Sequence, residues 1–390
     1  MGLAKFFCSA ALALICTGGV IAAEGPAPLK PATPQGSLAA ALPATKWIEL
    51  EHSVDRGLAW MAEHQAVDGS FTDGRTSAAA QPAVTSFCVM AFLSRGHLPG
   101  FGPYGAKLEK AIDFVLACQK PDGLFCYESP EAVWVSKMAS HTATYNHAIA
   151  GLMLGEVYGH VTGRRMKEVK QAIDRALQFT RDLQTRPKTF PQDRGGWRYL
   201  RLHYDHTAAD SDLSVTACQL MFLRSARNAE FEVPQSYIDD AMSYVHRSFD
   251  TSQGVFMYTL SGAERYSSRG LMGAGIVSLS LAGQHQTPMA LAAGEWLLAR
   301  PFRRYGEMSP QGETFCYSTY YVSQAALQLG GKYWEGIFPP LARALMEAQE
   351  PDGSWPLVGN GDETLGRVYC TAMSVLSLTP GYQLLPVYQR

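Results

Sequence analysis

Basic residues are not in excess in this 390-residue chain: 33 Lys and Arg stand against 35 Asp and Glu, for a formal net charge of −2. A nucleic-acid footprint or a polybasic membrane patch needs surplus positive charge, so neither is supported. Charged residues make up only 17% of the chain, whereas hydrophobic residues make up 47%. This balance excludes a disordered chain and a coiled coil, and it supplies material for a large core.

Strand-like alternation of apolar and polar residues is also missing. Cysteine is sparse, since only six of the eight cysteines lie beyond residue 23. That is too few for a disulfide scaffold, but individual disulfides remain open in an oxidising compartment. The candidate pairs are Cys118/Cys126 and Cys316/Cys370, and separate buried thiols are the alternative.

The apolar run at the start of the chain is too short to span a membrane, which takes about 20 residues. It follows Lys5, extends from Phe6 to about Ile15, and is followed by small residues up to position 23. This order is typical of a secretory signal peptide. We expect residues 1–23 to be that signal and the mature protein to be exported, periplasmic or secreted, without a transmembrane segment. An uncleaved anchor is the alternative.

Residues 24–46 are rich in Pro and Ala and have few large apolar side chains. Such a composition is typical of a linker. The folded domain is therefore expected over residues 47–390.

Four segments share a glutamine that is followed by a turn with a glycine and an aromatic residue. They are EHQAVDGSF at 63–71, ACQKPDGLF at 117–125, EAQEPDGSW at 347–355 and, more loosely, LQTRPKTFPQDRGGW at 183–197. Apolar residues lie 4, 7 and 11 positions before the glutamine, for example Val115, Ile112 and Leu108 before Gln119. This spacing marks one face of an α-helix, and the glutamine can bond backbone groups of the next repeat.

A second, more uniformly apolar helix follows each turn, and such a helix belongs inside a structure. Outer helices are predicted at about 53–65, 107–119, 169–184, 234–249, 289–300 and 338–349, and inner helices at about 83–96, 143–160, 212–229, 267–284, 315–331 and 367–379. An open stack of helix pairs needs polar ends, yet the last inner helix, VYCTAMSVLSL, is as apolar as the others. The predicted fold is therefore all-α: six helical hairpins closed into an α/α toroid.

The glutamine–glycine–aromatic endings resemble the QW repeats of squalene-hopene cyclases. The chain resembles the terpenoid cyclase and protein prenyltransferase superfamily over about residues 48–385, and more narrowly the exported prenyltransferase/squalene oxidase repeat proteins of bacteria. Stretches such as YNHAIAGLMLGEVYG and GGWRYLR carry this likeness. It implies a toroid with a central cavity but no single activity, because the same toroid hosts cyclases, protein prenyltransferases, complement thioester domains and binding proteins.

Residues 210–216, DSDLSVT, open the third predicted inner helix. Class II terpene cyclases have Asp-x-Asp-Asp at such a position. The resemblance implies that Asp212 is the acid that protonates an alkene or epoxide and that Asp210 is its partner. Leu213 stands where the last carboxylate would be. The structural alternative is that the Asp caps free N–H groups at the helix start.

Protein prenyltransferases bind zinc through Asp-x-Cys and a His. By resemblance, Cys316 stands at the position of the zinc-binding Cys. Cys370 stands where that family has the His, and Thr314 where it has the Asp. One ligand is therefore lost and one exchanged, so the ligand set is incomplete. We expect no cofactor. The alternative is zinc held by Cys316, Cys370 and Glu313.

Aromatic side chains on the inner helices are candidates for lining the cavity, where they suit an apolar or cationic ligand. Helix packing uses the same residues. His141, Tyr145 and His147 open the second predicted inner helix, and a Tyr/His pair at such a place also resembles the acid–base groups of polysaccharide lyases. The predicted cavity residues are Tyr145, His147, Trp197, Tyr317, Tyr320, Tyr321 and Tyr369.

We expect a toroid that binds an apolar, isoprenoid- or lipid-like molecule or a partner protein in its cavity, without full catalytic machinery. Two alternatives stay open: a class II terpene cyclase-like enzyme with Asp212 as general acid, and a polysaccharide-acting α/α barrel enzyme. The departures from catalytic patterns at Leu213, Thr314 and Cys370 favour the binding protein.

Overall fold

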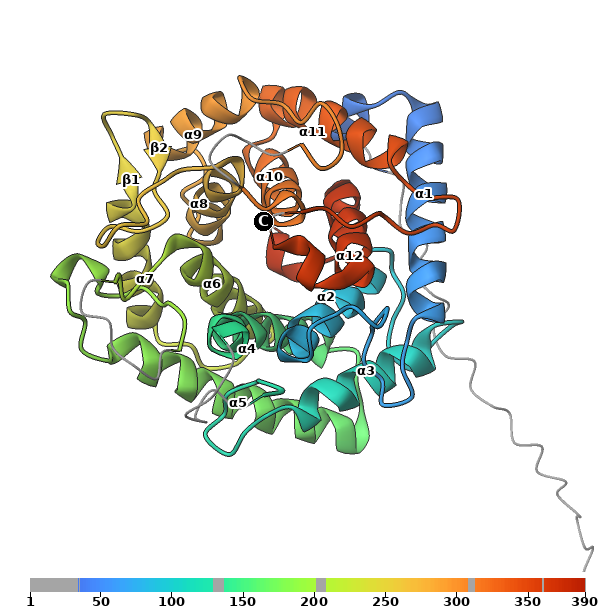
Figure 1. The fold of residues 1–390 in the computed structure, drawn as a ribbon, viewed down its shortest axis with the longest axis horizontal. Helices are drawn as coiled ribbons and strands as arrows, with labels where there is room; N and C mark the ends of the chain where they lie inside the picture. Colours follow the sequence, from blue (N-terminus) through green and yellow to red (C-terminus); the bar gives the residue numbers. More distant parts are fainter. Residues whose placement is uncertain are drawn as a thin grey trace, which may run out of the picture.

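The chain forms two concentric rings of α-helices (Figure 1). The computed structural model describes residue 34 and residues 36–128, 137–200, 208–307, 313–359 and 361–389, with only the backbone at 137 and 138. Twelve α-helices lie in these residues. The inner ring consists of α2 (Gln81–Leu93), α4 (Lys137–Tyr158), α6 (Leu213–Asn228), α8 (Arg269–Leu281), α10 (Phe315–Leu329) and α12 (Gly366–Leu378). The outer ring consists of α1 (Ala44–Glu63), α3 (Gly105–Ala117), α5 (Gly163–Thr185), α7 (Gln235–Arg247), α9 (Pro288–Leu298) and α11 (Gly331–Glu347).

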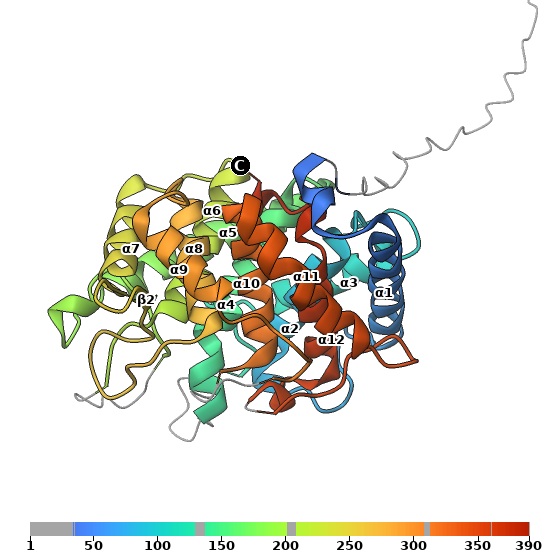
Figure 2. The same ribbon diagram turned by 90° about the horizontal axis from the view of Figure 1, so that it is seen from above.

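The inner ring is closed. Each inner helix packs against the next one along the chain, and α12 packs against α2. Seen from above, both rings form one layer of helices that run roughly along the ring axis (Figure 2). The strands in the described residues are β1 (Phe249–Asp250) and β2 (Val255–Phe256), a short antiparallel pair in the turn between α7 and α8. The prediction of an all-α toroid of six helical hairpins is confirmed.

Burial follows the apolar pattern of the sequence. Every residue of α2 is buried, whereas α5 and α7 bury one face and expose the other. α11 begins at Gly331, ahead of the expected 338, and carries two prolines in its interior. The predicted start comes from the apolar spacing before Gln349, which extends eleven positions back to Phe338. Packing extends the helix: the rings of Trp334 and Phe338 stack at 4.0 Å, and Trp47 of α1 stacks on Phe338.

Four turns join neighbouring outer helices through a side-chain hydrogen-bond pattern. In each, the glutamine Nε2 donates to the carbonyl of the turn glycine and to a carbonyl of the next outer helix. Gln349 closes the circle, since it donates to the Gly353 carbonyl at 2.7 Å and to the Ser53 carbonyl of α1 at 2.8 Å. The other acceptors are Gly69 and Lys107 for Gln65, Gly123 and Ala172 for Gln119, and Gly195 and Tyr237 for Gln184.

The turn glycines are needed for conformation and for close contact. Gly195 has a φ of +88°, and a Cβ there would lie 2.0 Å from the Asp240 carbonyl oxygen of α7. Gly353 has a φ of +93°, and a Cβ there would lie 2.6 Å from the Arg56 carbonyl oxygen of α1. Only a residue without a side chain lets the turn touch the backbone of the next outer helix.

The folded part of the chain begins earlier than expected. α1 starts at Ala44, and a 3₁₀ helix at Gly36–Ala41 packs against α11 within the segment predicted as a linker. The indole Nε1 of Trp47 donates to the Ala39 carbonyl, and that of Trp334 donates to the Leu38 carbonyl. The linker prediction over 24–46 therefore extended too far. The predicted signal peptide, 1–23, lies outside the described residues. No helix in the described part of the chain is long and apolar enough to cross a membrane.

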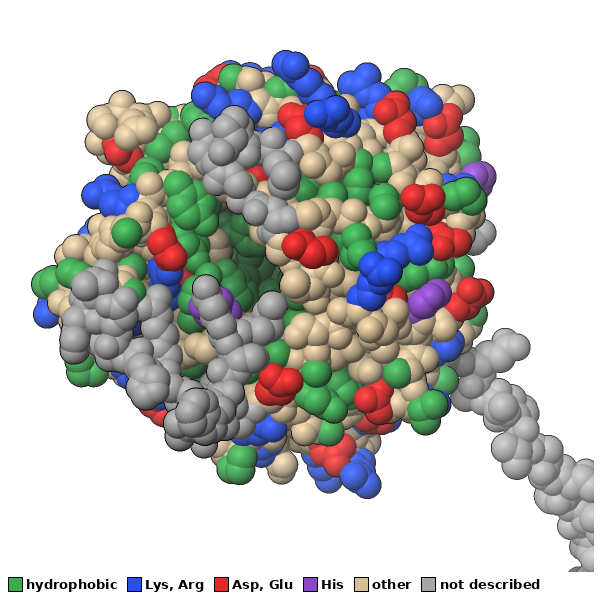
Figure 3. All heavy atoms as spheres, in the orientation of Figure 1, with side chains coloured by type: hydrophobic (Ala, Val, Ile, Leu, Met, Phe, Trp, Pro, Cys, Tyr) green, Lys and Arg blue, Asp and Glu red, His purple; other side chains and the backbone are tan. Residues whose placement is uncertain are grey.

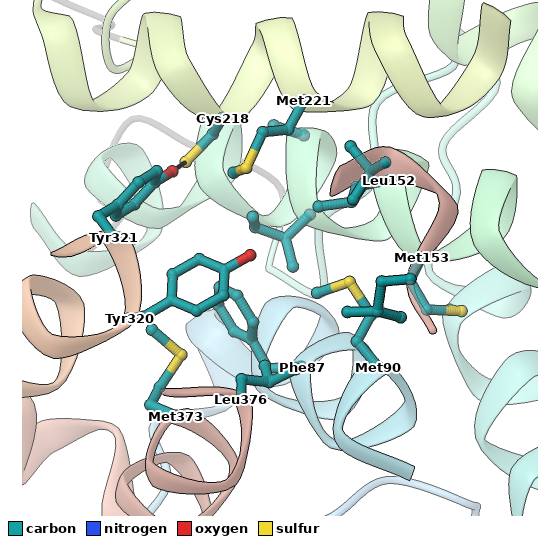
Figure 4. Close-up of a cluster of buried hydrophobic side chains, with 14 of the residues drawn as sticks. Phe87, Met90, Leu152, Met153, Cys218, Met221, Tyr320, Tyr321, Met373 and Leu376 are labelled. Atoms are coloured by element: carbon teal, nitrogen blue, oxygen red, sulfur yellow. Dashed lines mark hydrogen bonds between the residues drawn. The ribbon is translucent and has the colours of Figure 1, made fainter. Parts of the chain in front are cut away.

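The second halves of the inner helices fill the barrel with a packed core. Figure 4 shows side chains such as Met90, Leu152 and Met221 pointing toward one another from different inner helices. The C-terminal segment covers this core, because the Val387 N–H donates to Glu156 Oε2 at 3.3 Å and the Gln328 side chain donates to the Tyr388 carbonyl at 2.8 Å. This end of the barrel is therefore filled.

Gln349→Ala is expected to lower the free energy of unfolding by about 2–4 kcal/mol. It removes four hydrogen bonds of about 1 kcal/mol each, two donated by Nε2 and two that Oε1 accepts from Ser53 and Arg56. Urea denaturation measures the change. The matched control is Gln171→Ala on the exposed face of α5, with an expected change within about 0.5 kcal/mol. Equal stability of the two variants would contradict the joining role of Gln349.

Candidate functional site

A cavity of about 300 Å³ lies at the end of the barrel where the inner helices begin. Its walls come from the first halves of α2, α4, α10 and α12, together with Tyr199 and Cys218. Figure 3 looks into its mouth and shows hydrophobic side chains deep in the hollow. Other hollows, of about 610, 640 and 710 Å³, carry several charged side chains in their walls. The cavity enclosed by the inner helices is therefore the candidate site.

Seven aromatic side chains contribute to the cavity wall. Four of the predicted residues line it, namely Tyr145, Tyr317, Tyr321 and Tyr369. Three further aromatic residues also line it: Phe87, His141 and Tyr199. The rings of His141 and Tyr199 lie 4.3 Å apart, and the Tyr199 hydroxyl is 2.6 Å from that of Tyr258. These contacts fix the orientation of the rings at the mouth.

His147 does not line the cavity. It is fully buried, its Nδ1 accepts from the Phe125 N–H at 3.4 Å, and its Nε2 lies 2.9 Å from the Thr180 hydroxyl. In other repeats the N–H of the turn aromatic donates to a threonine hydroxyl, namely Thr85, Thr216 or Thr371. His147 thus takes the place of that threonine. Burial lowers its pKa to about 3, so it is neutral.

Trp197 and Tyr320 also lie away from the cavity. The Trp197 indole is fully buried between the inner and outer rings of helices, and its Nε1 donates to the Thr180 carbonyl at 2.9 Å. The Tyr320 hydroxyl contacts that of Tyr388, in the core beneath the cavity. These two residues and His147 were wrongly assigned to the cavity because packing selects the same aromatic residues as ligand binding.

Asp362 is the carboxyl in the described part of the cavity wall, and no sequence pattern singled it out. It lies in a 3₁₀ turn just before α12 and is 1% exposed. Its Oδ2 accepts from the Cys316 N–H at 3.0 Å. Burial raises its pKa to about 6, against the backbone hydrogen bond from Cys316, which lowers it.

Asp212 caps α6 and is not among the residues that line the cavity. Its Oδ1 accepts from the Val215 N–H at 2.8 Å, which is the arrangement of an N-cap. Its Oδ2 lies 4.0 Å from Nε of the buried Arg198 and has no hydrogen-bond partner among the described residues. Burial raises the pKa of Asp212 to about 6, and the Arg198 cation opposes that rise. At neutral pH most of this carboxyl is therefore ionised.

Asp210 contacts the backbone rather than Asp212. Its Oδ2 accepts from the Thr189 N–H at 2.6 Å, and its own N–H donates to Asp193 Oδ2 at 2.7 Å. The structure thus gives Asp210 a role in holding the loop before α6. The carboxyl pair expected from the cyclase motif has no hydrogen bond between its members among the described residues.

A family model described as "Prenyltransferase alpha-alpha toroid domain" matches residues 104–328, which is more than half of the chain. The chain belongs to this family. No curated protein matches the toroid by sequence.

Solved structures with the same fold come from enzymes of different classes. A variant of the type II terpene cyclase MstE from Scytonema, in complex with geranylgeranyl dihydroxybenzoate, is 15% identical, has a TM-score of 0.55, and covers 88% of this chain and 100% of its own. A GH76 α-mannanase from Bacteroides thetaiotaomicron is 11% identical, with a TM-score of 0.58 and coverage of 87% and 98%. A glycosidase is 14% identical, with a TM-score of 0.56 and coverage of 88% and 100%. At these identities the likeness extends to the fold alone.

The zinc alternative does not fit the toroid. Glu313 accepts from Arg269 Nε at 2.6 Å and from the Arg269 N–H at 3.0 Å, so its carboxylate forms a buried ion pair. Among the described residues, no three His, Cys, Asp or Glu side chains are placed to hold a metal ion. Cys316 and Cys370 are buried, and burial raises the pKa of the Cys316 thiol, which disfavours the thiolate that zinc requires. Neither candidate cysteine pair forms a disulfide in the described structure.

Asp212→Asn is expected to change how stability depends on pH. The folded pKa of about 6 exceeds the ordinary value of 3.8, so the fold favours the protonated acid and loses stability as pH rises from about 4 to 6. Asparagine keeps the cap but cannot ionise. The stability difference between variant and parent at pH 4 serves as the reference. From that reference, the variant should gain about 2–3 kcal/mol on the parent at pH 7. Urea denaturation at both pH values measures this.

Asp182→Asn, on the exposed face of α5, is the control and should leave the pH dependence unchanged. A parallel pH dependence in the parent and Asp212→Asn would contradict the raised pKa of Asp212.

Proposed function

We propose that this toroid is an exported protein that binds a small apolar molecule in its central cavity, without the full catalytic machinery of the cyclases. The observation that carries the proposal is the cavity wall, in which aromatic and aliphatic side chains surround a space with few polar groups. Ligand sites are usually concave, mostly apolar and supplied with a few polar groups that orient the ligand.

The cavity size limits the ligand. About 300 Å³ is at the lower end of the range for ligand sites, roughly 300–1,000 Å³. One end of the barrel is filled by the packed core and the C-terminal segment, so the cavity cannot extend along the axis in that direction. A short isoprenoid or a compact ring compound fits this space better than a long polyprenyl chain.

The acid–base groups argue for binding over turnover. Asp212, the acid implied by the cyclase resemblance, caps a helix outside the cavity wall. Glycosidases usually need two carboxyl groups that flank the scissile bond. Asp362 is the one Asp or Glu in the described wall. The polysaccharide alternative therefore lacks its second group at this site.

Isothermal titration calorimetry with geraniol, a short uncharged isoprenoid, tests the binding. Ala83 lines the cavity, so Ala83→Phe should fill part of it and weaken binding at least tenfold. Ala106→Phe, on the exposed side of α3, adds the same ring outside the cavity and should leave the affinity unchanged. Equal affinities in the two variants would contradict the proposed site. Asp212-dependent formation of a cyclised product from geranylgeranyl or epoxide substrates would overturn the non-catalytic part of the proposal.

Export is tested separately, by expressing the full chain in a bacterium and determining the N-terminus of the protein outside the cytoplasm. Cleavage after the small residues at positions 22 and 23 should give a mature chain that begins near Glu24. Retention of an intact Met1 in the cytoplasmic fraction would contradict the signal peptide.

A further inference from the structure

The carboxyl of Asp362 is buried in the cavity wall without a cation beside it. It is 1% exposed, and it forms no ion pair with any Lys, Arg or His in the described ranges. Its hydrogen-bond donors are neutral groups: the Cys316 N–H, 3.0 Å from Oδ2, the Cys316 thiol and the Phe315 N–H. Buried carboxylates are costly unless a cation accompanies them, so this group needs a positive partner or must stay protonated.

The described wall holds one basic side chain, His141, whose ring centroid lies 4.3 Å from that of Tyr199. No Lys or Arg is among the described residues that line the cavity. Arg198 lies behind Tyr199, and two carboxylates already contact it: Asp212 at 4.0 Å, and Glu264. The Arg198 guanidinium therefore already has two acidic partners. Asp362 is the one acidic side chain in the described wall.

Aromatic rings enclose the same space. Phe87, Tyr145, Tyr199, Tyr317, Tyr321 and Tyr369 all line the cavity. Phe87 and Tyr369 meet edge to face with their centroids 6.0 Å apart. Tyr369 follows Asp362 by seven residues, at the start of α12, so the carboxyl and the rings belong to one wall. The faces of aromatic rings attract cations through their quadrupole.

We propose that the ligand of this cavity is an organic ammonium compound with an apolar body, whose cation lies between Asp362 and the aromatic wall. This inference rests on the proposed function, namely that the cavity binds a small molecule. A substituted ammonium suits the site because it presents methyl or methylene groups to the rings and its charge to the carboxylate. An uncharged isoprenoid would leave the Asp362 carboxylate without a positive counter-charge.

Two ligands of equal shape distinguish the contribution of charge to the affinity from that of apolar contact. Phenyltrimethylammonium and tert-butylbenzene differ by nitrogen for carbon, so only the first carries a charge. Isothermal titration calorimetry on the whole mature protein should show the ammonium binding at least tenfold more tightly than the hydrocarbon. This comparison uses the parent protein and does not depend on whether a variant folds.

Asp362→Asn then assigns the preference to one side chain. The amide oxygen can still accept from the Cys316 N–H, but the charge is gone. We expect the tenfold preference for the ammonium to disappear while the affinity for tert-butylbenzene stays within about twofold. Glu335→Gln, on the exposed side of α11, removes the same charge outside the cavity and should preserve the preference.

The outcomes separate the two proposals. Equal or tighter binding of tert-butylbenzene to the parent would overturn the ammonium inference and leave the apolar cavity in place. An ammonium preference that survives in Asp362→Asn would overturn the role of Asp362. Failure of geraniol and of both isosteres to bind the parent would overturn the proposed function as well.

Discussion

The toroid depends on hydrogen bonds that pass from one helical hairpin to the next. Each of four turn glutamines donates to its own turn and to the next outer helix, and Gln349 extends this series from the last outer helix back to the first. Apolar burial alone would permit an open stack of hairpins. The contact of α12 with α2 and the bond from Gln349 to Ser53 define a ring instead, and that ring brings the starts of the inner helices together around the cavity.

Most of the fold could be predicted from the sequence because two regularities report on it directly. The helical spacing before each turn glutamine marks the outer helices, and the uniformly apolar segments mark the inner ones. The boundaries were less certain where tertiary contacts extend an element. α11 starts early because aromatic stacking on Trp47 supports its first turns, and the segment 36–46 is ordered because Trp47 and Trp334 bond its backbone.

The cavity residues were harder to predict, for a physical reason. Whether an inner-helix aromatic faces the cavity or the outer ring depends on a rotation of the helix that apolar spacing does not fix when every face is buried. His147 shows the difficulty, since an imidazole acceptor replaces the hydroxyl found in other repeats. Asp362 was missed although it precedes the last inner helix much as Asp212 precedes the third. It is distinguished by its place in a wall whose described residues include no Lys or Arg, which is a property of the assembled cavity.

Because one end of the barrel is covered, the described cavity is open at one end only. The segment around Val387 and Tyr388 lies across the packed core, so in the described structure the cavity has its mouth at the opposite end. A solute must then enter and leave by the same opening. One occupant has to depart before another arrives, and the rate of exchange is limited by release rather than by the supply of a competitor.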